Sequence, residues 1–315
     1  MKNHIPNILK GAAMGIAEVI PGVSGGTIAF ITGIYEQLIN TIKAFGPSLF
    51  TTLKKDGLAG VWEAINGTFL VALLAGMALG VVARVFGITY LLDNYPVLVW
   101  AFFFGFIIAS AIYIGKQLTH WGAKEIIALI LGAIIAYGIT MITPVEGTTA
   151  LPIVFLSGAI AISALILPGI SGSFILLLLG MYTIIVPTVK TALKTLDPSS
   201  LLIVGVFALG CITGLMTFSR VLSWTFKHYK NTTLALLTGF MIGSLNKIWP
   251  WRIPTEWVRD ANGEYLLKDG VRKVLTEANV MPWEYNQEPY TIAAIVLIIV
   301  GFVAVFGLEK LGSKE

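Results

Sequence analysis

The sequence predicts an all-α integral membrane protein built as an inverted repeat of two units, each a re-entrant helix hairpin plus three transmembrane helices. Three observations predict this fold class. The composition is strongly apolar, several apolar runs are long enough to cross a bilayer, and a Pro-Gly-x-Ser-Gly string occurs twice, each time inside an apolar segment.

Composition separates the chain from soluble proteins. Of its 315 residues, 56% are hydrophobic and 12% are charged, whereas a soluble domain has about 25% charged residues. A helix of about 20 apolar residues crosses the hydrocarbon core of a bilayer. The runs that reach or approach this length are residues 67–92, 96–115, 123–142, 201–226, 232–249 and 291–306. The sequence therefore predicts six crossings.

Cysteine, histidine and charge exclude other classes of site. The single cysteine, Cys211, excludes an internal disulfide and a cysteine metal site. His4, His120 and His228 lie outside the apolar runs or at their ends, so no metal and no cofactor is expected. The net charge of +4 indicates basic residues on short cytoplasmic loops and not a nucleic-acid surface. The expected surroundings are the lipid bilayer, no nucleic acid is expected, and a homo-oligomer is left open.

An internal repeat divides the chain into residues 1–146 and 147–315. EVIPGVSGGTIAFITGIY, from residue 18, aligns with LILPGISGSFILLLLGMY at a shift of 147 residues. Downstream, Gly76 aligns with Gly210 at a shift of 134 residues. The first copy thus has 13 extra residues, which fall in the polar stretch 47–66, as a loop insertion should. Chance similarity is a poor explanation, because two separate blocks agree in order.

Each copy begins with an apolar segment that a proline interrupts. Residues 7–44 are too long for one span and break at Pro21-Gly22, and the second copy breaks at Pro168-Gly169. Proline removes a backbone donor and clashes with the preceding turn. Backbone groups freed at membrane depth must be buried in protein or line a wet cavity. We expect a re-entrant hairpin in each copy, and a kinked full span is the alternative.

One hairpin and three crossings per copy would orient the two copies oppositely, because three is odd. Inverted repeats are common in secondary transporters, whose sites lie at the midplane where half-helices meet. Lysines on short loops gather mostly on one side, which predicts that both termini are cytoplasmic. The other side receives a mixed-charge loop at about 250–289, in which Asp260-Ala261-Asn262-Gly263 is typical of a β-hairpin turn.

The residues around the breaks are the candidate substrate-binding groups. Glycines let the backbone turn with its N–H groups exposed, and hydroxyl side chains can cap the helix that follows. A helix N-terminus with unpaired N–H groups suits a phosphate. The candidates are Ser24, Gly25, Gly26 and Thr27 in the first copy and Ser171, Gly172 and Ser173 in the second. Two such termini meeting from opposite leaflets would form an anion site; tight helix packing at the glycines is the alternative.

Charged residues within the apolar segments are few. Arg84 and Arg220 would lie near opposite leaflets, and intramembrane charge is costly and usually functional. We expect both arginines to bind the anion, with snorkelling to lipid head groups as the alternative. Glu18, whose counterpart is Leu165, is the acid placed at a helix break. It is a candidate for proton coupling, and a capping carboxylate is the alternative.

The first break carries a family signature. It reads Gly15-x-x-Glu18-x-x-Pro21-Gly22-Val23-Ser24-Gly25-Gly26-Thr27, followed by Gly33-Ile34-Tyr35-Glu36. The string resembles the signature of bacterial polyprenyl-phosphate translocases, long catalogued as a domain of unknown function, and the resemblance covers nearly the whole chain. It implies a transporter, not an enzyme, in the bacterial cytoplasmic (inner) membrane. This transporter would return undecaprenyl phosphate, the lipid carrier of cell-wall assembly, from the outer to the inner leaflet. The second copy departs from the signature at Leu165 and at Ser173-Phe174, so the two half-sites are not expected to be equivalent.

Two other functions stay open. Undecaprenyl-pyrophosphate phosphatases also combine inverted repeats with a Pro-Gly-x-Ser motif, but an arginine follows their serine and holds the phosphate in the transition state. Gly25 and Gly172 occupy that position in this chain. A transporter or channel for a small soluble anion is the second alternative, and nothing in the sequence excludes it.

Overall fold

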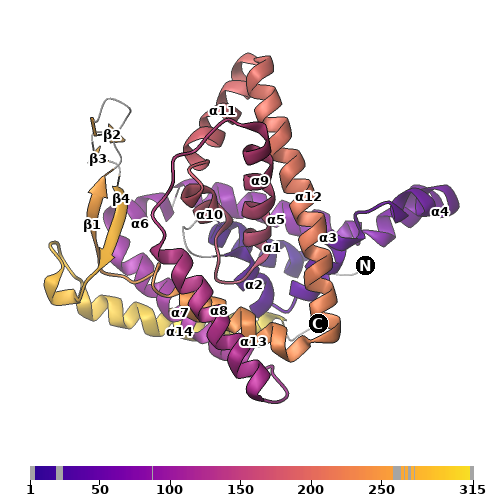
Figure 1. Cartoon of the computed structure of the whole chain (residues 1–315). Coiled ribbons are helices and arrows are strands. Elements are labelled where there is room, and N and C mark those ends of the chain that lie inside the picture. Colours follow the sequence, from indigo (N-terminus) through magenta and orange to yellow (C-terminus); the bar gives the residue numbers. More distant parts are fainter. Residues whose placement is uncertain are drawn as a thin grey trace.

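Helices make up most of the molecule, and a small β-hairpin lies on one side of it (Figure 1). The computed structural model describes residues 4–18, 24–86, 88–257, 264–265, 267–268, 271–272 and 274–312. The helices of the first copy are α1 (Ile5–Glu18), α2 (Gly25–Ile31), α3 (Tyr35–Ala44), α4 (Ser48–Ala64), α5 (Gly67–Phe86), α6 (Ile88–Asn94), α7 (Pro96–Gly115) and α8 (Ala123–Met141). Those of the second are α9 (Leu151–Ile166), α10 (Gly172–Leu178), α11 (Tyr182–Thr195), α12 (Pro198–His228), α13 (Lys230–Ser244) and α14 (Thr291–Gly312). The strands are β1 (Arg252–Trp257), β2 (Leu267–Lys268), β3 (Val271–Arg272) and β4 (Val274–Asn279).

The long helices have the length and surface of membrane spans. Four described helices, α7, α8, α12 and α14, can cross a membrane by length and composition, and six spans result if each of two bent helix pairs counts as one. Their outward faces stay apolar, since Ile134, Leu209 and Ile299 are each more than half exposed. Apolar surface of this extent is unusual in soluble monomers. The chain is therefore a multi-pass membrane protein.

Helix α13 is shorter than the apolar run that predicted it. Residues 232–249 are helical only to Ser244, and the 15 residues of the helix rise about 22 Å, less than the roughly 30 Å of a bilayer core. Pro250 disfavours a helical conformation at the preceding residue. Trp249 instead donates its indole N–H to the carbonyl of Val280 at 2.8 Å. The expected crossing at this run is thus a shorter helix followed by a turn.

The insertion in the first copy is a helix, and the prediction of a loop was wrong. Helix α4 projects from the body on the side opposite to the β-hairpin (Figure 1) and buries none of its residues. Gly57, at φ 64°, kinks it. Because α4 adds nothing to the core, the rest of the first copy can still match the second.

The broken segments each contain two breaks, whereas the sequence predicted one. The first segment forms α1, α2 and α3, and the second forms α9, α10 and α11. The additional breaks lie at Gly33 and Gly180, whose φ angles of 73° and 67° favour glycine. Helices α10 and α11 are bent by 108° at this point. The expected single re-entrant turn is therefore a pair of turns around a seven-residue helix.

The proline breaks themselves are described in one copy. Pro168 and Gly169 separate α9 from α10, and Gly169 has a φ of 84°. Pro21 and Gly22 lie outside the described residues, as does the predicted turn at residues 260–263. Near that turn, β1 pairs antiparallel with β4, and Arg252 lies opposite Asn279.

The two copies pack in matching ways. Helix α1 packs along α5 and its counterpart α9 along α12, while α7 packs along α14 and α8 along α13. A Cβ atom on Gly76 would collide with the carbonyl oxygen of Ile8, and one on Gly210 would collide with that of Phe155. Gly210 and Phe155 are the repeat counterparts of Gly76 and Ile8. The same missing side chain thus lets each helix pair approach closely.

The core lies where the copies meet. Helix α2 is completely buried and contacts α1, α7, α9 and α14. Buried side chains from both copies form one cluster there, including Phe30 and Tyr35 of the first and Ile166 and Phe174 of the second. This centre holds the ends of both broken segments.

Candidate functional site

The two broken segments bind each other directly. The hydroxyl of Ser24, just before α2, donates to the carbonyl oxygens of Leu167 and Leu165 at 3.0 and 3.2 Å, at the end of α9. In return, the hydroxyl of Thr27 accepts a hydrogen bond from the N–H of Gly169 at 3.2 Å. Ser24 and Thr27 are fully buried. The structure therefore brings together the motifs that the sequence selected, although 142 residues separate Thr27 from Gly169.

Glycine at this junction allows the two backbones to touch. A Cβ atom on Gly26 would collide with the carbonyl oxygen of Ile166, and one on Gly169 would lie 2.8 Å from the Cα of Met241. Tyr35 donates its phenol O–H to the same Ile166 carbonyl at 3.2 Å. Packing is thus one role of these glycines, as the alternative interpretation of the motif expected.

The first turn of α2 directs its N–H groups to acceptors of the protein itself. Gly25 donates to the Glu18 carboxylate at 3.1 Å, Gly26 to the Ser24 hydroxyl at 3.1 Å, and Thr27 to the Ser24 carbonyl at 3.0 Å. Glu18 therefore caps α2 in this structure. An anion could bind these three donors only by displacing acceptors of the first segment itself.

The second motif is more accessible. Ser171 is buried and caps α10, accepting from the N–H of Phe174 at 3.4 Å, and its hydroxyl lies 2.9 Å from that of the exposed Ser173. Gly172 packs its backbone against the Ala161 carbonyl of α9. The two half-sites therefore differ, because Ser24 bonds to the other copy while Ser171 bonds within its own.

A lysine that the sequence analysis missed lies beside the second motif. The ammonium group of Lys247 lies 4.9 Å from the centre of the Phe174 ring. Lys247, Ser171 and Gly169 line the same small hollow, which α8 closes. The sequence could have indicated Lys247, because this lysine lies inside the apolar run 232–249. The hollow therefore combines a cation with a hydroxyl donor.

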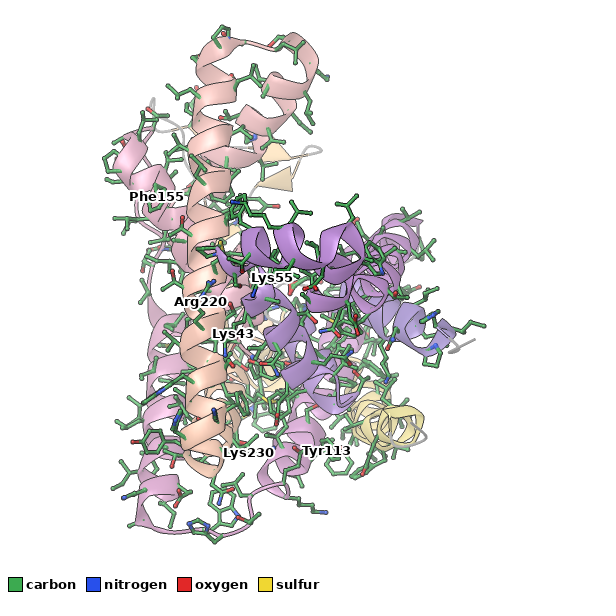
Figure 2. All side chains as sticks on the ribbon, turned by 90° about the vertical axis from the view of Figure 1, so that its right-hand side faces the viewer. Lys43, Lys55, Tyr113, Phe155, Arg220 and Lys230 are labelled. Atoms are coloured by element: carbon green, nitrogen blue, oxygen red, sulfur yellow. The ribbon has the colours of Figure 1, made fainter. Side chains whose placement is uncertain are left out.

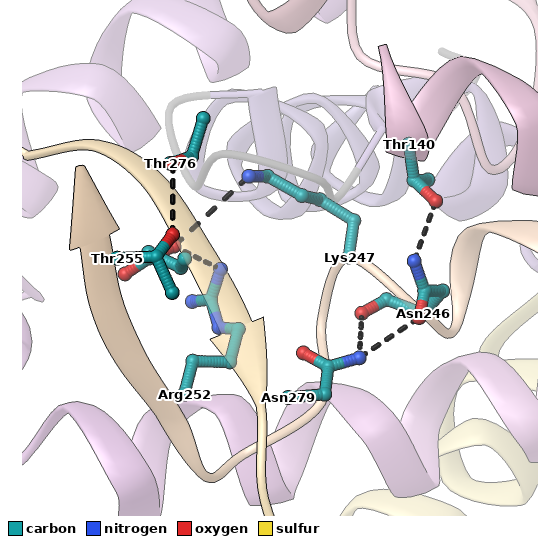
Figure 3. A network of polar contacts seen from close by, with 8 residues as sticks. Thr140, Asn246, Lys247, Arg252, Thr255, Thr276 and Asn279 are labelled. Atoms are coloured by element: carbon teal, nitrogen blue, oxygen red, sulfur yellow. Dashed lines mark hydrogen bonds and ion pairs between the residues drawn. The ribbon is translucent and has the colours of Figure 1, made fainter. Parts of the chain in front are cut away.

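A polar network holds Lys247 at this position (Figure 3). The Glu277 carboxylate lies 4.0 Å from the Lys247 ammonium and 2.8 Å from the Arg252 guanidinium. Neighbouring Asn246 donates to the Thr140 hydroxyl at 2.6 Å and accepts from Asn279 at 2.8 Å. The β-hairpin is thereby tied to the second motif.

Arg252 is the buried member of this network. Its guanidinium lies 4.6 Å from the centre of the Trp100 ring, and its Nε atom has no hydrogen-bond partner among the described residues. Burial lowers the pKa of Arg252, and the negative charge of Glu277 acts in the opposite direction. Two cations thus share one carboxylate beside the second motif, which leaves a net positive charge there.

The structure places the side chain of one of the two predicted arginines, and it lies between α12 and the end of α3. Arg220 of α12 donates to the carbonyls of Met216 at 2.6 Å and of Phe45 at 3.1 Å. It therefore fastens the end of α3 to α12. The backbone of Arg84 lies in α5, and its side chain lies outside the described part of the chain.

An apolar groove of about 470 Å³ runs between α7 and α13. Ile108, Ile112, Ile242 and Leu245 line it, and Lys116 lies at its end. Such a groove suits a hydrocarbon chain, because its walls offer apolar side chains for close contact.

Comparison with known proteins covers both copies of the repeat. Residues 14–266 match the family described as undecaprenyl phosphate translocase-like. A polyprenyl-phosphate transporter of Vibrio cholerae is 43% identical, over 99% of this chain and 98% of the relative. A polyprenyl-phosphate transporter of Staphylococcus aureus is 34% identical, over 80% of this chain and 88% of the relative. No solved structure matches the chain.

Proposed function

Since the chain belongs to the undecaprenyl phosphate translocase-like family, we propose that it carries undecaprenyl phosphate, or a related polyprenyl phosphate, from the outer to the inner leaflet of the bacterial cytoplasmic membrane. The released lipid would then serve again in cell-wall polymer synthesis. The observation that carries the proposal is the direct contact between the two broken segments, through Ser24, Thr27 and Gly169. A helix break at the boundary between repeats is where transporters place their substrates.

We propose that the two copies form an inverted repeat, with both termini in the cytoplasm. Matching glycines make matching contacts, and the counterpart of the α8–α13 pair is the α14–α7 pair. A two-fold relation would exchange these two pairs. Two copies related in this way can rock against each other and expose one central site to either leaflet in turn.

The phosphate head group would enter at the second motif. Lys247 supplies a positive charge, and Ser171 and Ser173 supply hydroxyl donors on the same side of α10. A hydrogen bond from a charged donor to phosphate is about twice as strong as a neutral one. The prenyl chain would remain in the apolar groove between α7 and α13 or in the lipid.

Passage of the head group would require the junction to open. In this structure, Ser24 and Thr27 connect the copies and the first-turn donors of α2 are occupied. Separating α2 from α9 would free the hydroxyls of Ser24 and Thr27 and the N–H of Gly169 for the phosphate. The half-sites would then act in sequence, the second motif first and the first motif on opening.

The proposal is tested by a leaflet-resolved assay of undecaprenyl phosphate in reconstituted vesicles. Protein-containing vesicles should move the lipid between leaflets faster than protein-free vesicles, and without releasing phosphate from undecaprenyl pyrophosphate. Unchanged leaflet distribution would contradict transport, and phosphate release would favour the phosphatase alternative. If the protein also transports inorganic phosphate, and if inorganic phosphate at the same concentrations inhibits transport of the lipid, a transporter of small anions would be favoured.

A further inference from the structure

A second cationic site lies away from the junction. A cleft of about 350 Å³ opens between α3, the last turns of α12 and the start of α13. Lys43, Lys227 and Lys230 line it, with Glu36 as the one carboxylate among its described lining residues. In the inverted topology this end of α12 faces the cytoplasm.

Helix α12 directs one face toward this cleft. Arg220, Ser223 and Lys227 are spaced by three and four residues and therefore share a side of the helix. In Figure 2, Arg220, Lys43 and Lys230 follow one another along α12 toward its C-terminal end. Because Arg220 donates to the carbonyl of Phe45 at 3.1 Å, it holds the end of α3 beside that face.

Hydrogen bonds position one lysine, while an ion pair neutralises another. Lys43 donates to the Ser223 hydroxyl at 3.1 Å, and that hydroxyl donates to the Asn40 side-chain carbonyl at 3.2 Å. Lys230 pairs with Glu36 at 2.7 Å, and both of these side chains are more than half exposed. Lys43 and Lys227 thus keep a net positive charge in the cleft.

The cationic cluster belongs to one end of the molecule. Lys43 has Lys190 as its repeat counterpart, but the counterparts of Lys227 and Lys230, 134 residues earlier, are Asp93 and Pro96. The fold therefore does not require these cations, since the other copy makes its corresponding helices without them. Basic residues are common at a cytoplasmic end, and it is their convergence with Lys43 on one cleft that points to an anion.

We propose that the cleft binds a phosphate group, namely the head group of the transported lipid, at the cytoplasmic end of its path. This inference rests on the proposed function. Lysine ammonium groups form short, charge-assisted bonds to phosphate oxygens, and the cleft volume of about 350 Å³ accommodates a phosphate group. The walls come from different copies, α3 from the first and α12 from the second. A movement between the copies would therefore alter the cleft as the junction opens.

The test measures binding of farnesyl phosphate, a short polyprenyl phosphate, to the purified full-length protein. Lys43→Gln with Lys227→Gln should weaken binding by about tenfold or more, as loss of charged hydrogen bonds does. The matched control is Lys190→Gln with Lys194→Gln, which removes the same charge from exposed positions of α11 and should bind as wild type. Lys227→Gln alone should also weaken binding, and it removes no hydrogen bond to a described residue. Thermal unfolding of each variant verifies that it is folded.

Equal binding by the two double variants would overturn the proposal. If inorganic phosphate competes with farnesyl phosphate and binds with the same affinity, the assignment to a lipid head group would be overturned. Weak competition would support that assignment. Suppose that the wild-type protein does not transport undecaprenyl phosphate, but that the Lys43 and Lys227 substitutions weaken binding of farnesyl phosphate. The proposed function would then be wrong, whereas the phosphate site would be supported. If the wild-type protein transports the lipid and the variants bind farnesyl phosphate as well as wild type does, the proposed function would be supported and the site would be wrong.

Discussion

The hydroxyl of Thr27 accepts a hydrogen bond from the backbone N–H of Gly169, at 3.2 Å and within the buried centre of the protein. Thr27 belongs to the first broken segment and Gly169 to the second. Their bond, with the two that Ser24 donates, closes the boundary between the copies. The proposed transport cycle depends on breaking and remaking these contacts.

Ser24→Ala should destabilise the closed protein more than Ser171→Ala. The first change leaves the partly buried carbonyls of Leu165 and Leu167 without this donor and the buried N–H of Gly26 without its acceptor. An unsatisfied buried polar group costs about 1–3 kcal/mol. Thermal unfolding in detergent measures the difference. Similar losses for both serines would contradict a special role of Ser24 between the copies.

Gly210→Ala should lower the stability of the folded protein, whereas Gly205→Ala on the same helix should not. A Cβ atom at Gly210 collides with the Phe155 carbonyl of α9, and one at Gly205 meets open space. Overpacking of this kind costs about 1–3 kcal/mol. Expression level and thermal unfolding of the two variants provide the measurement. If Gly205→Ala is as harmful, helix packing is not the cause.

Lys247→Met should reduce lipid binding while leaving the fold intact. Methionine keeps an apolar stem beside Phe174 but removes the positive charge from the second motif. We expect binding of a polyprenyl phosphate to weaken about tenfold, the effect of losing one charged hydrogen bond. Lys194→Met, at an exposed position of α11, is the control. Equal affinities of the two variants would remove Lys247 from the site.

Glu18→Gln tests proton coupling. Inward movement of a phosphate works against the membrane potential by about 2.3 kcal/mol per charge per 100 mV, so a co-transported proton would assist it. Glutamine retains a carbonyl oxygen that can accept from the N–H of Gly25, as Glu18 does at 3.1 Å. The variant should therefore bind lipid normally but lose the response of transport to an imposed pH gradient. A normal response would leave Glu18 with the capping role alone.

Cysteine labelling tests the inverted topology. In a Cys211→Ser background, Thr255→Cys of β1 should react with an impermeant thiol reagent in spheroplasts, whereas Lys55→Cys of α4 should react only after lysis. Both positions are exposed, and the elements that carry them, β1 and α4, lie on opposite sides of the body (Figure 1). Labelling of both from outside would contradict the inverted topology, because an even number of crossings would then separate the two positions.

Much of the fold follows from patterns along the chain, whereas the site follows only in part. Apolar runs predicted most of the long helices, and the repeat predicted which segments correspond. The breaks at Gly33 and Gly180 were missed, because a glycine in an apolar helix often serves packing alone and its φ angle is not readable from sequence. Lys247 was missed because its partner Glu277 lies 30 residues further along, beyond the reach of local patterns.

The sequence by itself determined that the protein crosses a membrane, and it predicted two related copies that each begin with a broken segment. Composition and spacing decide these features, because a bilayer accepts only long apolar helices whose backbone groups are satisfied. The tertiary structure alone decided how the breaks meet, with Ser24 and Thr27 bound to the other copy and Lys247 beside the second motif. These contacts join residues more than 70 positions apart, and only the packing of helices from both copies brings such residues within hydrogen-bonding distance.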